Sequence, residues 1–373
     1  MLALKEKLAK NYINAIGWKS KQKYLIIESD DWGTIRMPSI KVYNELIKSN
    51  IPVDRLSFDK HDSVESQDDL EALFKSLSSV TDSKGNPAVL TAFHVMANPN
   101  FEAVENNGRT EYVYETIVET YKRNPHTRES LNTIQKGMKM GIYIPQFHGR
   151  EHIHVKRWME AINSHSSKEK LAFDNKAIIS TRGRDDLNPY RKDYFKGFDY
   201  ETDEEAKEIE AIHRDGLRLF KKIFGMDSVT FVAQGCVWGD HLNAMLKSEG
   251  VNLLGGQQLQ PTERGHKTVD KKWGKVNSIG QVYWRRNAQL EPARNQNFNW
   301  VGKCLAEIEI AFRWGKPAVV SAHRENFIGS IFEDNRKQSL EKLELLLKKV
   351  LVKWPDVHFI SSARLAEIML QGR

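Results

Sequence analysis

The segment YLIIESDDWG, residues 24–33, joins an apolar run to a cluster of acidic side chains. Other apolar runs in the chain share this design, because each leads directly into residues that suit a metal or catalytic site. They are 88–93 before His94, 141–147 before His148, 228–233 before Gln234, and 317–322 before His323. The carboxyl ends of parallel strands meet at one face of a barrel, and enzyme sites are built there. We therefore expect these side chains to form one site.

Apolar strand-like runs alternate with amphipathic helical stretches, which is typical of an α/β fold with parallel strands. Further strands are expected at 251–254, 280–284 and 357–360. The longest expected helices are 203–224 and 335–354. The sequence thus predicts a distorted (β/α) barrel, seven-stranded, in a single domain. That domain covers residues 1–373, with insertions near 164–203 and 255–278 that are rich in charged and turn residues.

Composition narrows the class of protein. Hydrophobic residues make up 40% and charged residues 28%, which is ordinary for a globular domain. The net charge is +7, but acidic residues lie between the basic ones, so no nucleic-acid partner is expected. No stretch approaches the ~20 apolar residues of a transmembrane helix. The first ten residues lack the apolar core of a signal peptide, and a cytoplasmic location is expected. The two cysteines suggest no disulfide framework.

His148-Gly-Arg-Glu-His152 is the strongest local signal for a metal. On a helical turn, four-residue spacing places both imidazoles on one face, where they can bind one cation. Asp30-Asp31 would supply a carboxylate, because adjacent buried acids repel each other unless a cation or shared proton intervenes. The alternative is that Asp31 only caps a turn and Asp30 is solvated. One carboxylate and two imidazoles favour a divalent metal, zinc above all, with positions left open for water.

These motifs together resemble the polysaccharide deacetylases of carbohydrate esterase family four, whose domain is called NodB-like. The shared features are an apolar strand before Asp-Asp, a His-x-x-x-His, and a late Val-Val-x-x-His, and the final strand and helix also match. The resemblance implies that Asp30 is the catalytic base and that Asp31, His148 and His152 bind the metal. It implies that His323 is the general acid.

The chain departs from the family pattern at several positions. Trp32 is inserted before Gly33, and Gly149 and Ile153 replace the usual residues of the second motif. The third motif lacks the arginine that orients the base in the family. Substitutes for it, or substrate-binding residues, are predicted to be Arg150, Arg285 and Arg286.

Two further residues are predicted to contact substrate. His94 follows a strand and would face the site, as a hydrogen-bonding group or a fourth ligand, unless it is a structural histidine. Trp238 would stack on a sugar ring, although partial burial in the core is the usual fate of a tryptophan.

The sequence therefore predicts a metal-dependent hydrolase that removes acetyl groups, N-acetyl in particular, from a saccharide or glycan precursor. Two alternatives stay open. A glycoside hydrolase of a related barrel would use Asp30 with Glu291 or Asp240 as its carboxylate pair. A non-catalytic carbohydrate-binding descendant would have kept the site and lost turnover, as the missing third-motif arginine suggests.

Overall fold

The computed structural model describes residues 4–164, 167–180, 194–256, 259–261 and 268–371. Within these ranges, the strands of the main sheet are β1 (Tyr24–Trp32), β2 (Leu90–Val95), β5 (Tyr143–Gly149), β6 (Thr230–Val232), β7 (Leu253–Gly255), β10 (Val282–Tyr283), β11 (Ala288–Gln289), β12 (Ala318–His323) and β13 (His358–Phe359). Two antiparallel pairs lie apart from it: β3 (Ala97–Pro99) with β4 (Tyr114–Thr116), and β8 (Leu259–Pro261) with β9 (Thr268–Asp270).

Helices occupy most of the remaining described chain. They are α1 (Leu4–Ala15), α2 (Ile40–Lys48), α3 (Ser57–His61), α4 (Gln67–Ser78), α5 (Phe101–Asn106), α6 (Ile117–Arg123), α7 (Ser130–Lys139), α8 (Val155–Asn163), α9 (Ser167–Asp174), α10 (Asp203–Phe224), α11 (Leu242–Ser248), α12 (Trp300–Arg313), α13 (Glu333–Lys353) and α14 (Ser362–Gln371), with short 3₁₀ turns η1 (Gln234–Cys236), η2 (Pro292–Arg294) and η3 (Arg324–Phe327).

The main sheet is parallel and curls into a distorted (β/α) barrel, which confirms the predicted fold. Its strand order is β10-β7-β6-β5-β2-β1-β12-β11, and β13 pairs with the start of β1. The five runs that end in functional residues are β6, β5, β2, β1 and β12, and they are neighbours in this order. The sheet of the described residues has nine strands instead of seven, because two-residue strands such as β11 and β13 extend it.

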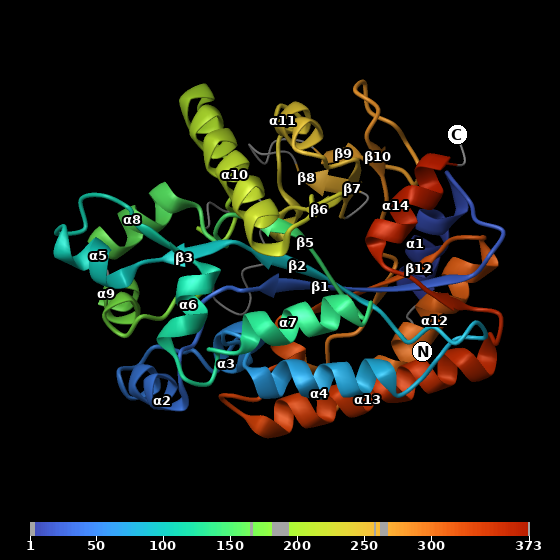
Figure 1. The fold of residues 1–373 in the computed structure, drawn as a ribbon, viewed down its shortest axis with the longest axis horizontal. Coiled ribbons are helices and arrows are strands. Elements are labelled where there is room, and N and C mark those ends of the chain that lie inside the picture. The colour runs from blue at the N-terminus through green and yellow to red at the C-terminus, as the bar shows by residue number, and fades with distance from the viewer. Residues whose placement is uncertain (1–3, 165–166, 181–193, 257–258, 262–267, 372–373) are drawn as a thin grey trace.

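Alternate side chains of β1 face opposite sides of the sheet, as the pleat requires. Ile26 packs inside the curl with Phe93, Val232 and Val319, and Met369 of α14 closes that cluster. Leu25 and Ile27 belong instead to the outer core, where the sheet meets its covering helices. Figure 1 shows α4, α7 and α13 along one side of the sheet and α10 along another. A strand buried on both faces explains the continuous apolar run at 24–27.

Short elements gather at the carboxyl end of β1. In Figure 1 the arrowheads of β1 and β2 point toward the region that holds α2, α3, α5, α8 and α9. α9 lies inside the first predicted insertion, and β8 and β9 lie inside the second. Residues 165–166, 181–193, 257–258 and 262–267 of those ranges lie outside the described residues, so the two insertions stay predictions. No helix in the described part of the chain is long and apolar enough to cross a membrane.

Gly149, the last residue of β5, has a backbone conformation that other residues rarely adopt. Its φ is +135°, and a Cβ atom placed on it would lie 2.4 Å from Nε2 of Gln234. Gly149→Ala should therefore lower the free energy of unfolding by about 2–6 kcal/mol, from backbone strain plus overpacking.

Gly141→Ala is the matched control. Gly141 also has positive φ, at +71°, but a Cβ atom there would meet nothing within 4 Å. Its cost should be only the ~1–2 kcal/mol of a left-handed residue. Urea denaturation of the two variants measures the difference. Equal losses of stability would show that the contact with Gln234 does not constrain this position.

Candidate active site

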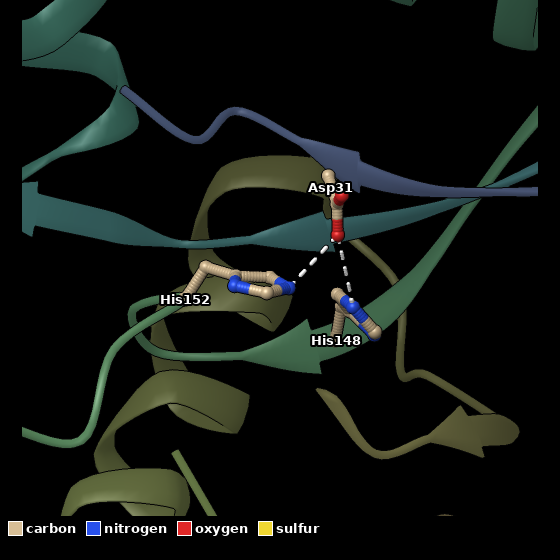
Figure 2. A group of neighbouring side chains, drawn as sticks. All are labelled: Asp31, His148 and His152. Atoms are coloured by element: carbon tan, nitrogen blue, oxygen red, sulfur yellow. Dashed lines mark ion pairs between the residues drawn. The ribbon is translucent and has the colours of Figure 1, made fainter. Parts of the chain in front are cut away.

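Asp31, His148 and His152 lie together at the carboxyl ends of β1 and β5, as predicted. Their ligand atoms all fall within 4.8 Å of one another. Oδ1 of Asp31 is 3.4 Å from Nε2 of His148 and 2.8 Å from Nε2 of His152. Figure 2 shows both imidazoles turned toward the same carboxylate. The two histidine rings therefore point to one side of the chain, as a shared cation requires.

A bulge in β1 brings both neighbouring aspartates to this site. Adjacent residues of a regular strand point to opposite faces of the sheet. The pairing of β1 with β2 shifts register between Ser29 and Trp32, and Asp31 has a φ of +75°. Such a left-handed residue at a functional position costs backbone energy that its surroundings must offset. It also lets Asp31 reach the histidines while Asp30 keeps the inward direction of a regular strand.

Buried polar contacts hold the bulge in place. The amide N–H of Gly33 donates to both carboxylate oxygens of Glu65, at 3.1 and 3.2 Å. Arg324 donates to Glu65 at 2.8 Å and to the carbonyl oxygen of Thr34 at 2.7 Å. Arg324 and Glu65 are both fully buried. Moving the turn that follows Asp31 would break this network and leave a buried charge without its partner, which is strongly unfavourable. The network therefore fixes the turn.

The predicted helical turn at 148–152 is wrong. His148 is in β5, His152 lies in the bend that follows, and α8 starts only at Val155. The four-residue spacing still works because the chain reverses at Gly149. Nε2 of Gln234 donates to the carbonyl oxygens of His148 and Glu151, at 2.9 and 2.5 Å, and so fastens the bend from η1.

The donor set fits a divalent cation. Nδ1 of His148 lies 2.8 Å from the carbonyl oxygen of Val232 and must be the protonated nitrogen, since a carbonyl only accepts. In the neutral ring, which is the form that binds a metal, Nε2 of His148 then presents a lone pair to the Asp31 carboxylate. Two acceptors facing each other repel unless a cation lies between them, and a backbone carbonyl behind a histidine is the usual support of a metal ligand.

Asp30 is paired with Arg286, one of the predicted substitutes for the third-motif arginine. Arg286 donates from Nη1 and Nη2 to the two oxygens of Asp30, each at 2.6 Å, and from Nε to Glu28 at 2.6 Å. Burial raises the pKa of Asp30, but the charge and hydrogen bonds of Arg286 outweigh it, so that pKa lies below its ordinary value. Asp30 is therefore ionised at neutral pH. Arg286 lies in the connection between β10 and β11, which are the two edge strands of the curled sheet.

His323, at the end of β12, completes the group. Its Nδ1 lies 2.6 Å from Oε1 of Glu291, and its Nε2 lies 3.9 Å from Oδ2 of Asp30. Asn326 donates to the other oxygen of Glu291 at 2.7 Å. Burial alone would lower the pKa of His323, but the Glu291 carboxylate outweighs it and raises the pKa to about 9. His323 is thus a protonated imidazolium at neutral pH, with Nε2 directed toward Asp30.

Four residues predicted to contact substrate lie in other surroundings. His94 has no exposed surface, and its Nε2 is 2.7 Å from the Tyr143 hydroxyl. Trp238 is 2% exposed and packs edge-on against Phe231 in the core. Arg285 is 2% exposed and donates to the carbonyl oxygen of Lys271, while Arg150 is paired with Glu151 and Asp215. In this structure these four side chains support the barrel, and a substrate contact for them stays a prediction.

Sequence reasoning missed two roles. Glu28 is fully buried and accepts hydrogen bonds from Arg286, from Nε1 of Trp284 at 2.9 Å, and from the hydroxyl of Ser362. The sequence did contain a signal for this role, because a glutamate inside an apolar strand needs a hydrogen-bonding or charged partner. Glu291 was considered only as a glycosidase carboxylate, whereas the structure pairs it with His323. Its position just after β11 was the available signal, but a two-residue strand is too short to detect by pattern.

No protein-family model matches this chain, and no curated protein matches it. Solved structures do resemble it. Puue allantoinase is 11% identical, with 94% of this chain and 91% of that chain covered and a TM-score of 0.47. A polysaccharide deacetylase from Mycobacterium smegmatis is 12% identical, with 96% and 94% covered and a TM-score of 0.42. A glycoside hydrolase/deacetylase from Parabacteroides distasonis is 10% identical, with 94% and 72% covered and a TM-score of 0.48.

Polysaccharide deacetylases are thus among the solved structures that this chain resembles, as the motifs predicted. The TM-scores of all three structures are below 0.5, so these likenesses assign no function to this chain.

His152→Ala should weaken zinc binding about 10-fold or more, because it removes one of three ligands. His154→Ala is the matched control: His154 is the N-cap of α8, where its Nδ1 accepts from the amide of Arg157. Calorimetric titration of the apo-protein with zinc measures both affinities. Equal zinc affinity in the two variants and the wild type would mean that His152 is not a ligand.

Proposed function

We propose that this protein is a metal-dependent amide hydrolase that removes acetyl groups, N-acetyl in particular, from a saccharide or glycan precursor. The observation that carries the proposal is the arrangement of three groups of side chains at one barrel face. An ionised aspartate is held by an arginine, a protonated histidine by a glutamate, and an aspartate faces two imidazoles. These are the groups that hydrolysis of an unreactive acyl bond needs: a base, an acid and a cation site. The motif resemblance to polysaccharide deacetylases supports the acetylated saccharide as substrate.

In this proposal the residues divide the proton transfers between them. A divalent cation held by Asp31, His148 and His152, zinc above all, would polarise the acyl carbonyl and lower the pKa of a water. Asp30 would accept the proton of the attacking water, since it is ionised and has its carboxylate fixed by Arg286. His323 would donate a proton to the departing amine from Nε2, while Glu291 holds Nδ1 and so fixes the direction of the ring.

The glycoside hydrolase alternative requires one protonated carboxyl group beside one ionised carboxylate. Burial raises the pKa of Glu291, but His323 outweighs it, so the pKa of Glu291 lies below its ordinary value, as does that of Asp30. Asp240 is mostly exposed and paired with Lys271 at 2.8 Å. These pairings favour proton donation by His323 over proton donation by Asp30, Glu291 or Asp240.

The non-catalytic alternative rested on the missing third-motif arginine. Arg286 lies where such an arginine would act, with two hydrogen bonds to Asp30. This position of Arg286 supports turnover over binding alone.

Asp30→Asn should abolish turnover and leave zinc affinity unchanged, because it removes the proposed base and no ligand. His323→Ala should lower kcat by about 10²–10⁴ on an amide substrate, the usual contribution of a positioned proton donor. The loss should be smaller on an activated ester, whose leaving group needs no proton. Acetate release from N-acetylated and O-acetylated sugars measures these rates. If His323→Ala lost the same factor on both bond types, proton donation would not be its role.

Glu291→Gln gives a test that depends on pH. His323 works in its protonated form, which the raised pKa preserves up to about pH 9, so wild-type kcat/KM should fall as pH rises through about 9. Without the Glu291 charge the pKa of His323 falls, and the loss of activity should begin at lower pH. The measurement is the pH profile of kcat/KM for both proteins. If kcat/KM fell over the same pH range in both proteins, Glu291 would not set the pKa of His323.

A further inference from the structure

Arg294, the last residue of η2, extends its guanidinium beside the proposed general acid. Its Nη2 is 3.6 Å from Oε1 of Glu291, the carboxylate that holds His323. Its Cζ lies 5.6 Å from the centre of the Phe58 ring, and the same ring meets that of His323 edge-on at 5.0 Å. Arg294 therefore lies beside the Glu291–His323 pair that would protonate the leaving group.

The hydrogen-bond donors of Arg294 are not used within the described part of the chain. A guanidinium carries five N–H donors, and a hydrogen bond from nitrogen to oxygen spans ~2.7–3.2 Å. The carboxylates nearest to Arg294 are at 3.6 and 3.9 Å. By contrast, Arg286 and Arg324 each donate to two acidic side chains at 2.9 Å or less. The side chain of Arg294 is 38% exposed, so its donors are accessible to a ligand.

The charge of Arg294 is also only partly compensated. Glu291 already accepts from His323 and Asn326. Glu325, the other neighbour, has its pKa raised to about 8 by burial and by the Glu291 charge, so it is mostly protonated at neutral pH. Arg36 lies 5.8 Å from the same Phe58 ring but forms an ion pair with Asp59 at 3.1 Å. Arg294 is thus a cation beside the site with open donors and weak counterions.

A cation placed in this way suits an anionic part of the substrate, because guanidinium binds carboxylate and phosphate groups through paired hydrogen bonds. The alternative is an arginine that is simply solvated at the rim, as many exposed arginines are. The aromatic contact with Phe58 and the position beside Glu291 favour a ligand-binding role, since both restrain the guanidinium next to the reacting groups.

We propose that Arg294 binds an anionic group, a carboxylate or a phosphate, which the substrate carries on its leaving-amine side. The substrate would then be an acidic N-acetylated amino sugar rather than a neutral one. This inference rests on the proposed function and specifies its substrate class.

The test compares three substrates with the zinc-loaded protein: N-acetylglucosamine, its 6-phosphate, and N-acetylglucosaminuronate, in which carbon 6 is a carboxylate. Wild-type kcat/KM should be about 10- to 100-fold higher for at least one anionic sugar than for the neutral one. Arg294→Gln should remove that preference, so that kcat/KM falls about 10- to 100-fold more on the preferred anionic sugar than on the neutral one. The two anionic substrates show whether phosphate or carboxylate is the preferred group.

Arg214→Gln is the matched control, since it also removes one positive charge. Arg214 lies on α10 with a side chain that is 32% exposed and paired with Glu210 and Glu249. This variant should keep the wild-type preference. The inference is overturned if the wild type does not prefer an anionic sugar, or if Arg294→Gln lowers neutral and anionic rates equally.

A failure of the proposed function can be told apart from a failure of this inference. If no acetylated sugar is turned over, the proposed function fails, and binding then tests Arg294 alone. Calorimetry with the zinc-loaded Asp30→Asn variant should show tighter binding of glucosamine 6-phosphate or glucosaminuronate than of glucosamine. Adding Arg294→Gln should abolish the difference. Equal affinities for all three sugars would refute the inference.

Discussion

Three carboxylates, those of Glu28, Asp30 and Asp31, lie buried within four residues of one strand. The rest of the site depends on the side chains that pair with these negative charges. Buried charge is tolerated only when it is paired and hydrogen-bonded. Arg286 donates hydrogen bonds to both Glu28 and Asp30. Trp284 and Ser362 also donate to Glu28, and the two imidazoles face Asp31. These partners come from three parts of the chain, residues 148–152, 284–286 and 362, so the site is complete only when these segments have packed around β1.

The same constraint explains the local strain. In a regular strand the neighbouring side chains of Asp30 and Asp31 would point to opposite faces of the sheet. The left-handed conformation of Asp31 directs both side chains to the inner face. Glu65 and Arg324 hold the turn that follows. At the end of β5, two strands away from β1 in the sheet, Gly149 and Gln234 shape the bend between the two histidines. Asp31 gives up backbone energy to position its side chain, which is common at functional sites, whereas Gly149 adopts its positive φ without that cost.

The sequence was sufficient for the elements that repeat a pattern. Apolar runs predicted β1, β2, β5, β6 and β12, and the residues after them predicted that Asp31, His148 and His152 meet. It was insufficient where geometry depends on contacts distant in the chain. The helical turn at 148–152 was wrong because a glycine bend gives the same spacing, and His94 follows a strand yet is enclosed by the core. Glu291 as the partner of His323 depends on a two-residue strand that has no periodicity to detect.

The central claim is that Asp31, His148 and His152 bind one catalytic cation, and anomalous X-ray diffraction at the zinc edge tests it most directly. Crystals of the zinc-loaded protein should show one strong peak about 2.0–2.3 Å from Oδ1 of Asp31 and from Nε2 of both histidines. Asp30 and His323 should lie outside that first coordination shell. No peak among these three residues at saturating zinc, or a peak bound by Asp30 in place of Asp31, would contradict the account.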